Sequence, residues 1–221
     1  FIDCPGSDDF IGGVVTSLNV TDTALILLNA QYGVEVGTHN HFRYTEKFNK
    51  PVIFVTNQLD HEKADFDKTI EQLKENYGGK VVLIQYPVTV GPQFNAVVDV
   101  LKMKMYRWKP EGGVPEVLEI PDSEIEKAQE YHNALVESAA EHDEALMEKF
   151  FDQGSLDEEE MRVGIRKGML HRDMFPVFCV SAGKDMCVRR LMEFVGNVSP
   201  SVNVTEKPQT KDGKEIAPDP S

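Results

Sequence analysis

The sequence contains no apolar run near the roughly 20 residues that a membrane-spanning helix requires. Its first ten residues also lack the basic segment that begins a secretory signal peptide. Basic residues are scarce throughout, with 23 Lys and Arg against 37 Asp and Glu, and the net charge is −14. This charge excludes a general binder of nucleic acid or of anionic membranes, since such binders attract polyanions with a positive surface. We therefore expect a cytoplasmic protein with no membrane contact and at most local contacts with RNA.

Cysteine is rare, and its spacing excludes a disulfide framework and a zinc or redox pair. Cys4, Cys179 and Cys187 form no CxxC motif and are spread over a long chain. Such scattered, unpaired cysteines are typical of a protein in a reducing compartment. Histidine offers no metal site in its place, because His39 and His41 would point to different sides of a helix and no third ligand is close in sequence. We interpret both as surface histidines.

Apolar residues make up 41% of the 221 positions, enough to bury the core of one large α/β domain. They come in short runs that alternate with amphipathic stretches, a pattern typical of a parallel sheet flanked by helices. The runs predict strands over Thr23–Asn29, Val52–Thr56, Val81–Tyr86 and Pro176–Val180. The amphipathic stretches predict helices over Phe10–Leu18, Phe66–Tyr77 and Met186–Val198.

Residues 91–171 interrupt this alternation. They predict two antiparallel strands followed by two helices, over Phe94–Trp108, Val114–Ile120, 123–151 and Asp157–His171. Ser123 and Glu126 have the spacing of a capping box and are expected to open the first helix. The fold class is therefore α/β, with an α+β unit inserted between two elements of the parallel sheet.

The two ends of the chain differ from the rest. Phe1, Ile2 and Asp3 have the composition of the end of a buried strand, yet no turn or cap precedes them, so we expect an excised piece of a longer protein. After Ser199 the composition shifts to Pro, Lys, Asp and Thr with few apolar residues, which indicates a linker or tail over 199–221.

Three short motifs follow expected strands, at the sheet edge where parallel α/β proteins bind ligands. The first is Asp3-Cys4-Pro5-Gly6. In such a motif the carboxylate of Asp3 can hold Mg²⁺, directly or through water, and Gly6 lets a backbone N–H approach a terminal phosphate. The alternative is an ordinary transition from strand to turn.

The second motif, Asn57-Gln58-Leu59-Asp60, follows the strand that begins at Val52. A carboxylate at Asp60 can accept two parallel hydrogen bonds from N1–H and the exocyclic amine of guanine, which adenine cannot offer, and Asn57 can bond N7. The pattern selects guanine. Taken alone, it is also explained by a polar loop with an Asx-turn.

The third motif is Ser181-Ala182-Gly183-Lys184, after the last expected strand. Backbone N–H groups in such a tight turn can point at guanine O6, and the stem of Lys184 can lie over the base. Alone, this motif carries little information. In this order, each after a buried strand, the three motifs predict a guanine-nucleotide site in which Asp60 lies near Ala182. An unrelated small-molecule enzyme would require all three to be accidental.

The segments that carry these motifs resemble the translational GTPases: FIDCPGSDDF, TALILLNAQYGVEVGT, VIFVTNQLDHEKADF, VVLIQYPV and FPVFCVSAGKD. The interruption, with VVDVLKMKMYRW and its two helices, is similar to the extra subdomain of elongation factor G. The resemblance runs from Phe1 to about Pro200. It implies a truncated P-loop-type G domain from the switch II motif onward, with its core at 1–90 and 172–198 and the inserted subdomain at 91–171.

The resemblance also implies what the intact protein binds and does. It would bind GTP or GDP with Mg²⁺, act on the ribosome in the cytoplasm, and promote translocation with GTP hydrolysis. Of the nucleotide-binding residues, Asp3 would hold Mg²⁺ through water. The residues that the resemblance assigns to the nucleotide are Asp3, Gly6, Asn57, Gln58, Asp60, Ser181, Ala182 and Lys184.

Two departures from the family concern catalysis and affinity. The family has a histidine, held to position the attacking water, where this chain has Ser7, whose hydroxyl has neither its reach nor its charge. We therefore assign no catalytic residue. The alternative function is a ribosome-binding, nucleotide-gated factor with little or no hydrolysis, such as a translocation-only paralogue or a ribosome-protection factor. Gln58 stands where the family has lysine, which predicts weaker binding without a change of base.

The phosphate-binding loop G-x-x-x-x-G-K-[ST] has no match among the 221 residues, and switch I has none either. In the family both precede the position of Phe1, and the strand that bears the loop lies between the strand ending at Asp3 and Thr23–Asn29. We therefore expect this chain by itself to be inactive, to bind nucleotide weakly at best and to carry no bound cofactor. The segment Phe1–Cys4 should fray, close onto its neighbour or pair with a second molecule.

The expected helix over 123–151 is rich in Glu and poor in Lys. A solvated face is the ordinary explanation of such a charge run. In elongation factor G the corresponding helix is thought to meet a basic domain of the ribosomal stalk protein, so the resemblance implies that partner. The methionines and aromatics of Phe94–Trp108 are interpreted as core, with a nucleic-acid stacking platform as the alternative.

Overall fold

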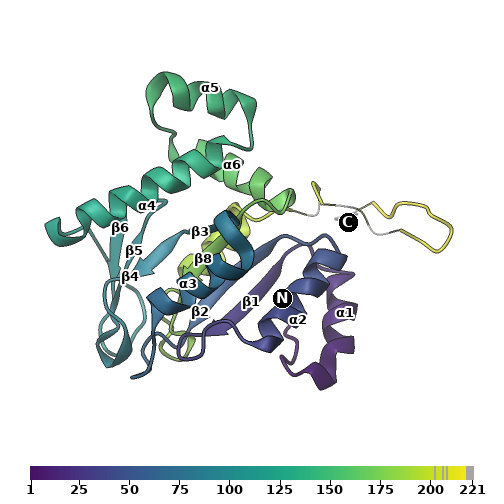
Figure 1. The fold of residues 1–221 in the computed structure, drawn as a ribbon, viewed down its shortest axis with the longest axis horizontal. Coiled ribbons are helices and arrows are strands. Elements are labelled where there is room, and N and C mark those ends of the chain that lie inside the picture. The colour runs from purple at the N-terminus through teal and green to yellow at the C-terminus, as the bar shows by residue number, and fades with distance from the viewer. Residues whose placement is uncertain (202, 206, 208, 218–221) are drawn as a thin grey trace.

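The structure is a computed structural model, and it describes residues 1–201, 203–205, 207 and 209–217. A four-stranded parallel sheet lies at its centre (Figure 1). The two central strands are buried along almost their whole length, which explains why their sequences are continuous apolar runs. The strands in spatial order are β1 (Ala24–Asn29), β2 (Val52–Asn57), β8 (Phe175–Cys179) and β3 (Val81–Leu83).

Helices cover both faces of this sheet. Phe54 and Phe178 point to opposite faces, because the register pairs Phe54 with the residue before Phe178. The ring of Phe54 lies 5.1 Å from that of Tyr77 in α3 (Phe66–Tyr77), while the ring of Phe178 lies 4.8 Å from that of Phe194 in α7 (Val188–Asn197). The helices that flank the parallel sheet are α1 (Ile11–Leu18), α2 (Val36–Lys47), α3 (Phe66–Tyr77) and α7 (Val188–Asn197).

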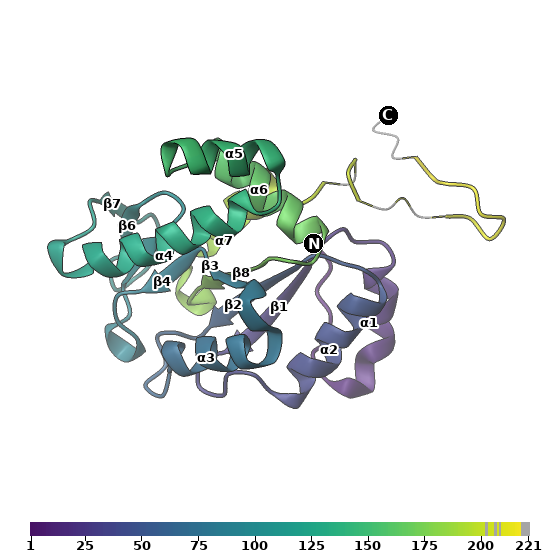
Figure 2. The same ribbon diagram turned by 45° about the horizontal axis from the view of Figure 1, so that its top comes forward.

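A second, antiparallel sheet and three helices lie between β3 and β8 in the sequence. Its strands, in spatial order, are β4 (Gln85–Pro87), β5 (Ala96–Asp99), β6 (Lys104–Arg107) and β7 (Glu116–Leu118). The helices are α4 (Asp122–Ala140), α5 (Glu144–Gln153) and α6 (Glu158–Leu170). Figure 2 shows α1, α2 and α3 on one side of the parallel sheet and α4, α5 and α6 on the other. The predicted α/β class, with a parallel sheet flanked by helices, is confirmed.

Two strand predictions were wrong in their extent. The expected strand Val81–Tyr86 is two strands, because Ile84 donates its N–H to Val177 of the parallel sheet (3.1 Å), while its C=O accepts from Val100, directly after β5 of the antiparallel one (3.0 Å). The expected strand Phe94–Trp108 is a hairpin of β5 and β6. The side chain of Asp99 accepts a hydrogen bond from the Lys102 backbone in the hairpin turn.

The helix predictions for the insertion also need correction. The expected capping box of Ser123 does not form: Pro121 is the N-cap, its φ of −68° already suits the residue before a helix, and no side chain caps α4. The expected single helix over 123–151 is broken into α4 and α5. Asp143 causes the break, since its carboxylate accepts from the backbone N–H groups of Ala145 and Leu146 and starts a new helix.

The start of the chain is not part of any strand. Phe1 is 86% exposed, and Phe1–Cys4 has no β pairing. β1 is the edge strand of the parallel sheet, and Phe1–Cys4 does not pair with its free edge. At the other end, Thr205 donates to the Asp22 carboxylate at 2.7 Å, and parts of the predicted tail (202, 206, 208 and 218–221) lie outside the described residues. Among the described residues, no helix is long and apolar enough to cross a bilayer.

Candidate functional site

Two of the three predicted motifs meet at one edge of the parallel sheet. The first loop, residues 57–60, continues from β2, and the second, residues 181–184, lies just after β8. Because β2 and β8 are parallel neighbours, both loops leave the sheet at the same edge. The Ser181 hydroxyl donates to Asp60 Oδ1 at 2.7 Å, and the Ala182 backbone N–H donates to Asn57 Oδ1 at 3.1 Å. The expected proximity of Asp60 and Ala182 is therefore confirmed.

Asp60 is the charged group of this pair of loops. Its carboxylate accepts the hydrogen bond from the Ser181 hydroxyl, and its Oδ2 forms an ion pair with Lys184 Nζ at 3.4 Å. Burial raises the pKa of Asp60, but hydrogen bonds from Ser181 and from its own backbone N–H, together with Lys184, outweigh burial and leave the pKa below its ordinary value. A lowered pKa in the folded state keeps the group ionised at neutral pH, and its stabilising contribution is lost only as the pH falls through that lowered value. Asp60 is therefore an acceptor only.

Asn57 and Gln58 join the first loop to its neighbours. Asn57 Oδ1 accepts from both the Gln58 and the Ala182 backbone N–H groups. Gln58 has a φ of 62°, the left-handed region, and its side-chain Oε1 accepts from Asn29 Nδ2 at 2.9 Å. The Gln58 side chain thus bridges to the end of β1. Asn29 was missed by the sequence analysis, although it ends β1 opposite Asn57 in the sheet register, and that position was the signal.

The second loop is a tight turn held at its base. Ser181 and Met186 exchange two backbone hydrogen bonds, of 3.2 and 3.0 Å, and Ala182–Lys184 form one turn of 3-10 helix between them. Asp185 and Cys187 both have positive φ, of 52° and 65°, which is strained for residues other than glycine. Such a conformation persists only where the surrounding structure imposes it.

The first motif is not joined to these loops. Asp3, Gly6 and Ser7 are exposed, and no hydrogen bond or ion pair between described residues links them to residues 57–60 or 181–184. The segment instead lies beside α1, where the Cys4 thiol is 3.1 Å from the Ser17 hydroxyl, and beside α2, where Asn40 donates to Asp8.

The two loops bring three polar groups together: the Asp60 carboxylate, the Asn57 amide and the backbone turn of residues 181–184. The first motif offers fewer. Magnesium needs several oxygen ligands, and Asp3 is a single exposed carboxylate. Among the described residues, no group of three His, Cys, Asp or Glu side chains could hold a metal ion. These residues therefore do not build a magnesium site by themselves.

Comparison with known proteins identifies the family. The model of the elongation factor Tu GTP binding domain matches residues 1–201. The crystal structure of a protein from Thermus thermophilus has a TM-score of 0.81 and 27% sequence identity to this chain, and the match covers 90% of this chain and 30% of the Thermus chain. This chain thus spans less than a third of the length of that protein. The chain belongs to the family of the elongation factor Tu GTP binding domain, the translational GTPases, and among them it resembles elongation factor G.

Proposed function

We propose that this chain is the guanine-reading part of a cytoplasmic translation factor that binds GTP and promotes ribosomal translocation. The observation that carries the proposal is the pair of contacts from Ser181 to Asp60 and from Ala182 to Asn57. They bring a carboxylate, a carboxamide and a backbone turn together at the carboxyl edge of the sheet. Family membership supports the proposal that the intact protein works with a guanine nucleotide and Mg²⁺.

Each group has a distinct proposed role toward the base. The Asp60 carboxylate accepts from guanine N1–H and the exocyclic amine, and the Asn57 amide donates to N7. Of the backbone N–H groups in this turn, that of Ala182 donates to Asn57, so the N–H of the exposed Gly183 is the better candidate donor to O6. The stem of Lys184 covers the base. Adenine has neither N1–H nor an amine at C2, so it leaves the carboxylate unpaired.

The phosphate end of the site depends on residues outside this chain. Asp3 and Gly6 are the proposed contacts to magnesium and the γ-phosphate in the intact protein, and the 221 residues contain no P-loop motif. We propose the ribosome as the partner, with the stalk protein at the acidic helices α4 and α5. The division into a core of 1–90 and 172–198, an insertion of 91–171 and a tail also remains a proposal.

Calorimetry with GDP and Mg²⁺ on this chain alone should give a Kd weaker than about 100 μM. The reason is that the N–H groups that cradle the α- and β-phosphates supply much of the affinity of such sites, and they are not in these residues. The control titrates the full-length factor under the same conditions. A Kd near 1 μM for the chain alone would mean that the phosphate site has been misplaced.

A second candidate function rests on Ser7, which stands where the family places its histidine. If hydrolysis is weak for this reason, Ser7→His in the full-length factor should raise ribosome-stimulated, single-turnover GTP hydrolysis by about tenfold or more. Ser7→Ala is the matched control and should not raise the rate. Efficient hydrolysis by the unaltered factor, with no gain from Ser7→His, would rule out the nucleotide-gated alternative.

A further inference from the structure

The turn between β6 and β7 of the insertion touches the backbone of the second loop, Ser181–Lys184, called the guanine loop below. Gly112 in that turn has a φ of 78°, and a Cβ built on it would lie 1.9 Å from the Lys184 carbonyl oxygen and 3.1 Å from its carbonyl carbon. Real Cβ atoms do not approach backbone atoms this closely. Only glycine fits here without moving one of the two segments.

The turn is anchored from the side of the insertion. The Gly112 N–H donates to the Lys109 carbonyl at 2.9 Å, and the indole N–H of Trp108 donates to the Gly113 carbonyl at 3.1 Å. Trp108 is buried in the hydrophobic core. These contacts fix the turn in place, and the Lys184 carbonyl packs against it at Gly112.

The backbone after the guanine loop is strained, and contacts on both sides of the loop hold it in this conformation. Lys184 is followed by Asp185 and then by Cys187, the two strained left-handed residues of this segment. The inner side of the loop is held by Asp60 and Asn57. On its other side, the backbone of Lys184 meets Gly112.

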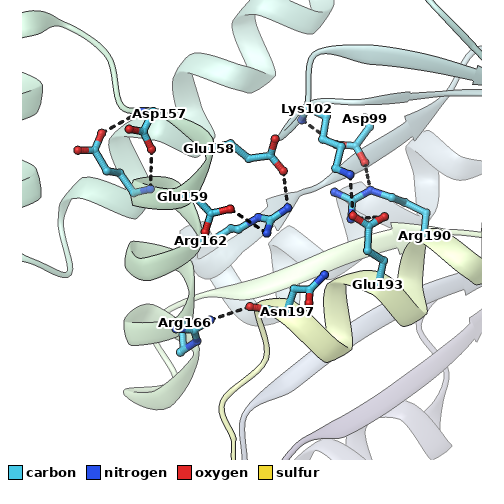
Figure 3. A network of polar contacts seen from close by, with 11 residues as sticks. Asp99, Lys102, Asp157, Glu158, Glu159, Arg162, Arg166, Arg190, Glu193 and Asn197 are labelled. Atoms are coloured by element: carbon cyan, nitrogen blue, oxygen red, sulfur yellow. Dashed lines mark hydrogen bonds and ion pairs between the residues drawn. The ribbon is translucent and has the colours of Figure 1, made fainter.

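A second tie from the insertion holds the helix that follows the loop. Arg190, in the first turn of α7, donates from Nε to Asp99 Oδ2 of β5 at 2.6 Å (Figure 3). Arg190 also lies 3.5 Å from Glu193, which in turn pairs with Lys102 at 2.6 Å. The segment from Lys184 to Arg190 is thus fixed at both ends by the insertion.

We propose that the insertion positions the guanine loop, and that the contact of Gly112 with the Lys184 backbone is the positioning contact that sets how long a guanine nucleotide stays bound. The proposal rests on the proposed function, because it takes Ser181–Lys184 as part of the base site. Gly112 is a positioning residue and does not touch the nucleotide.

The test compares Gly112→Ala with Gly113→Ala in the full-length factor. Gly113 also has a positive φ, 91°, but nothing lies within 4 Å of its Cβ position, so the two variants share the backbone strain and differ in the clash with Lys184. Stopped-flow measurement with a fluorescent GDP should show dissociation about tenfold faster in Gly112→Ala and within about twofold of the unaltered factor in Gly113→Ala. Equal dissociation rates in the two variants would overturn the proposal.

A second readout is independent of nucleotide. Cys187 is only 1% exposed, and burial, followed by its hydrogen bond with Cys179, raises the pKa of its thiol, so a thiol reagent should label it slowly. Mass spectrometry of the nucleotide-free protein separates labelling of Cys187 from that of the more accessible Cys4. We expect Gly112→Ala, and not Gly113→Ala, to accelerate Cys187 labelling severalfold. Equal labelling would overturn the positioning role, whereas failure of the unaltered factor to bind GDP would overturn the proposed function instead.

A milder variant guards against loss of folding. Trp108→Phe removes the indole donor to Gly113 and keeps an aromatic ring in the core. It should loosen the turn and give a smaller increase in both GDP dissociation and Cys187 labelling. If Gly112→Ala does not fold, an unchanged Trp108→Phe variant overturns the proposal.

Discussion

Asp60→Asn in the full-length factor is expected to weaken GDP binding by about 100-fold and to create binding of xanthosine diphosphate. The Asp60 carboxylate is ionised and can accept from both N1–H and the exocyclic amine of guanine. The asparagine amide has an oxygen that accepts and an NH2 group that donates. It can therefore accept from only one of the two guanine donors, and its NH2 group faces the other donor without forming a hydrogen bond. Xanthine carries an oxygen in place of that amine and therefore pairs with the amide.

The same substitution keeps the two loops together. An asparagine Oδ1 can still accept the hydrogen bond from the Ser181 hydroxyl, so the scaffold of the site is retained. Ser181→Ala is the control, because it removes that hydrogen bond and leaves the carboxylate in place. It should weaken GDP and xanthosine diphosphate by similar factors, without a change of preference. Titration with fluorescent nucleotides measures both variants, and an Asp60→Asn factor that binds GDP as well as the unaltered one would refute the guanine site.

Arg190→Met is expected to lower the free energy of unfolding of this chain by about 3 kcal/mol. Asp99 is 0% exposed and Arg190 6%, so removing the guanidinium leaves a buried carboxylate without its counter-charge. Burial lowers the pKa of Arg190, but the charge of Asp99 and the hydrogen bond to it outweigh burial and raise the pKa, so the guanidinium stays charged. A lost counter-charge in the interior costs more than a lost surface ion pair, which is screened by water.

Arg189→Met is the matched control for this variant. Arg189 is the preceding residue of α7, its side chain is 65% exposed, and its Nε lies 3.8 Å from Asp185. Its replacement should cost less than about 0.5 kcal/mol. Adding Asp99→Asn to Arg190→Met removes the stranded charge and should restore part of the loss. Urea unfolding followed by the fluorescence of Trp108, the single tryptophan, measures all three; equal losses for Arg189→Met and Arg190→Met would contradict the importance of the buried pair.

The sequence by itself determined the parts of the fold that depend on local periodicity and on capping. β1, β2 and β8 are apolar runs, and each lies within one residue of its predicted bounds. The helix predicted over Asp157–His171 is α6, which is capped by a reciprocal pair of hydrogen bonds between Asp157 and Glu160. Both loops of the candidate base site were found because their residues follow these strands directly. Neighbouring residues carry this information, so a short window of sequence contains it.

The tertiary structure alone decided how these elements are divided and held. The two halves of Val81–Tyr86 join different sheets because Ile84 bonds to Val177 on one side and to Val100 on the other. The periodicity of the segment contains no information about these partners. Asp99 and Arg190 lie 91 positions apart, and each alone looks like an ordinary surface charge. Gly112 looks like one more turn glycine until the fold brings the Lys184 carbonyl against it. These features are contacts between distant segments, and such contacts exist only once the chain has folded.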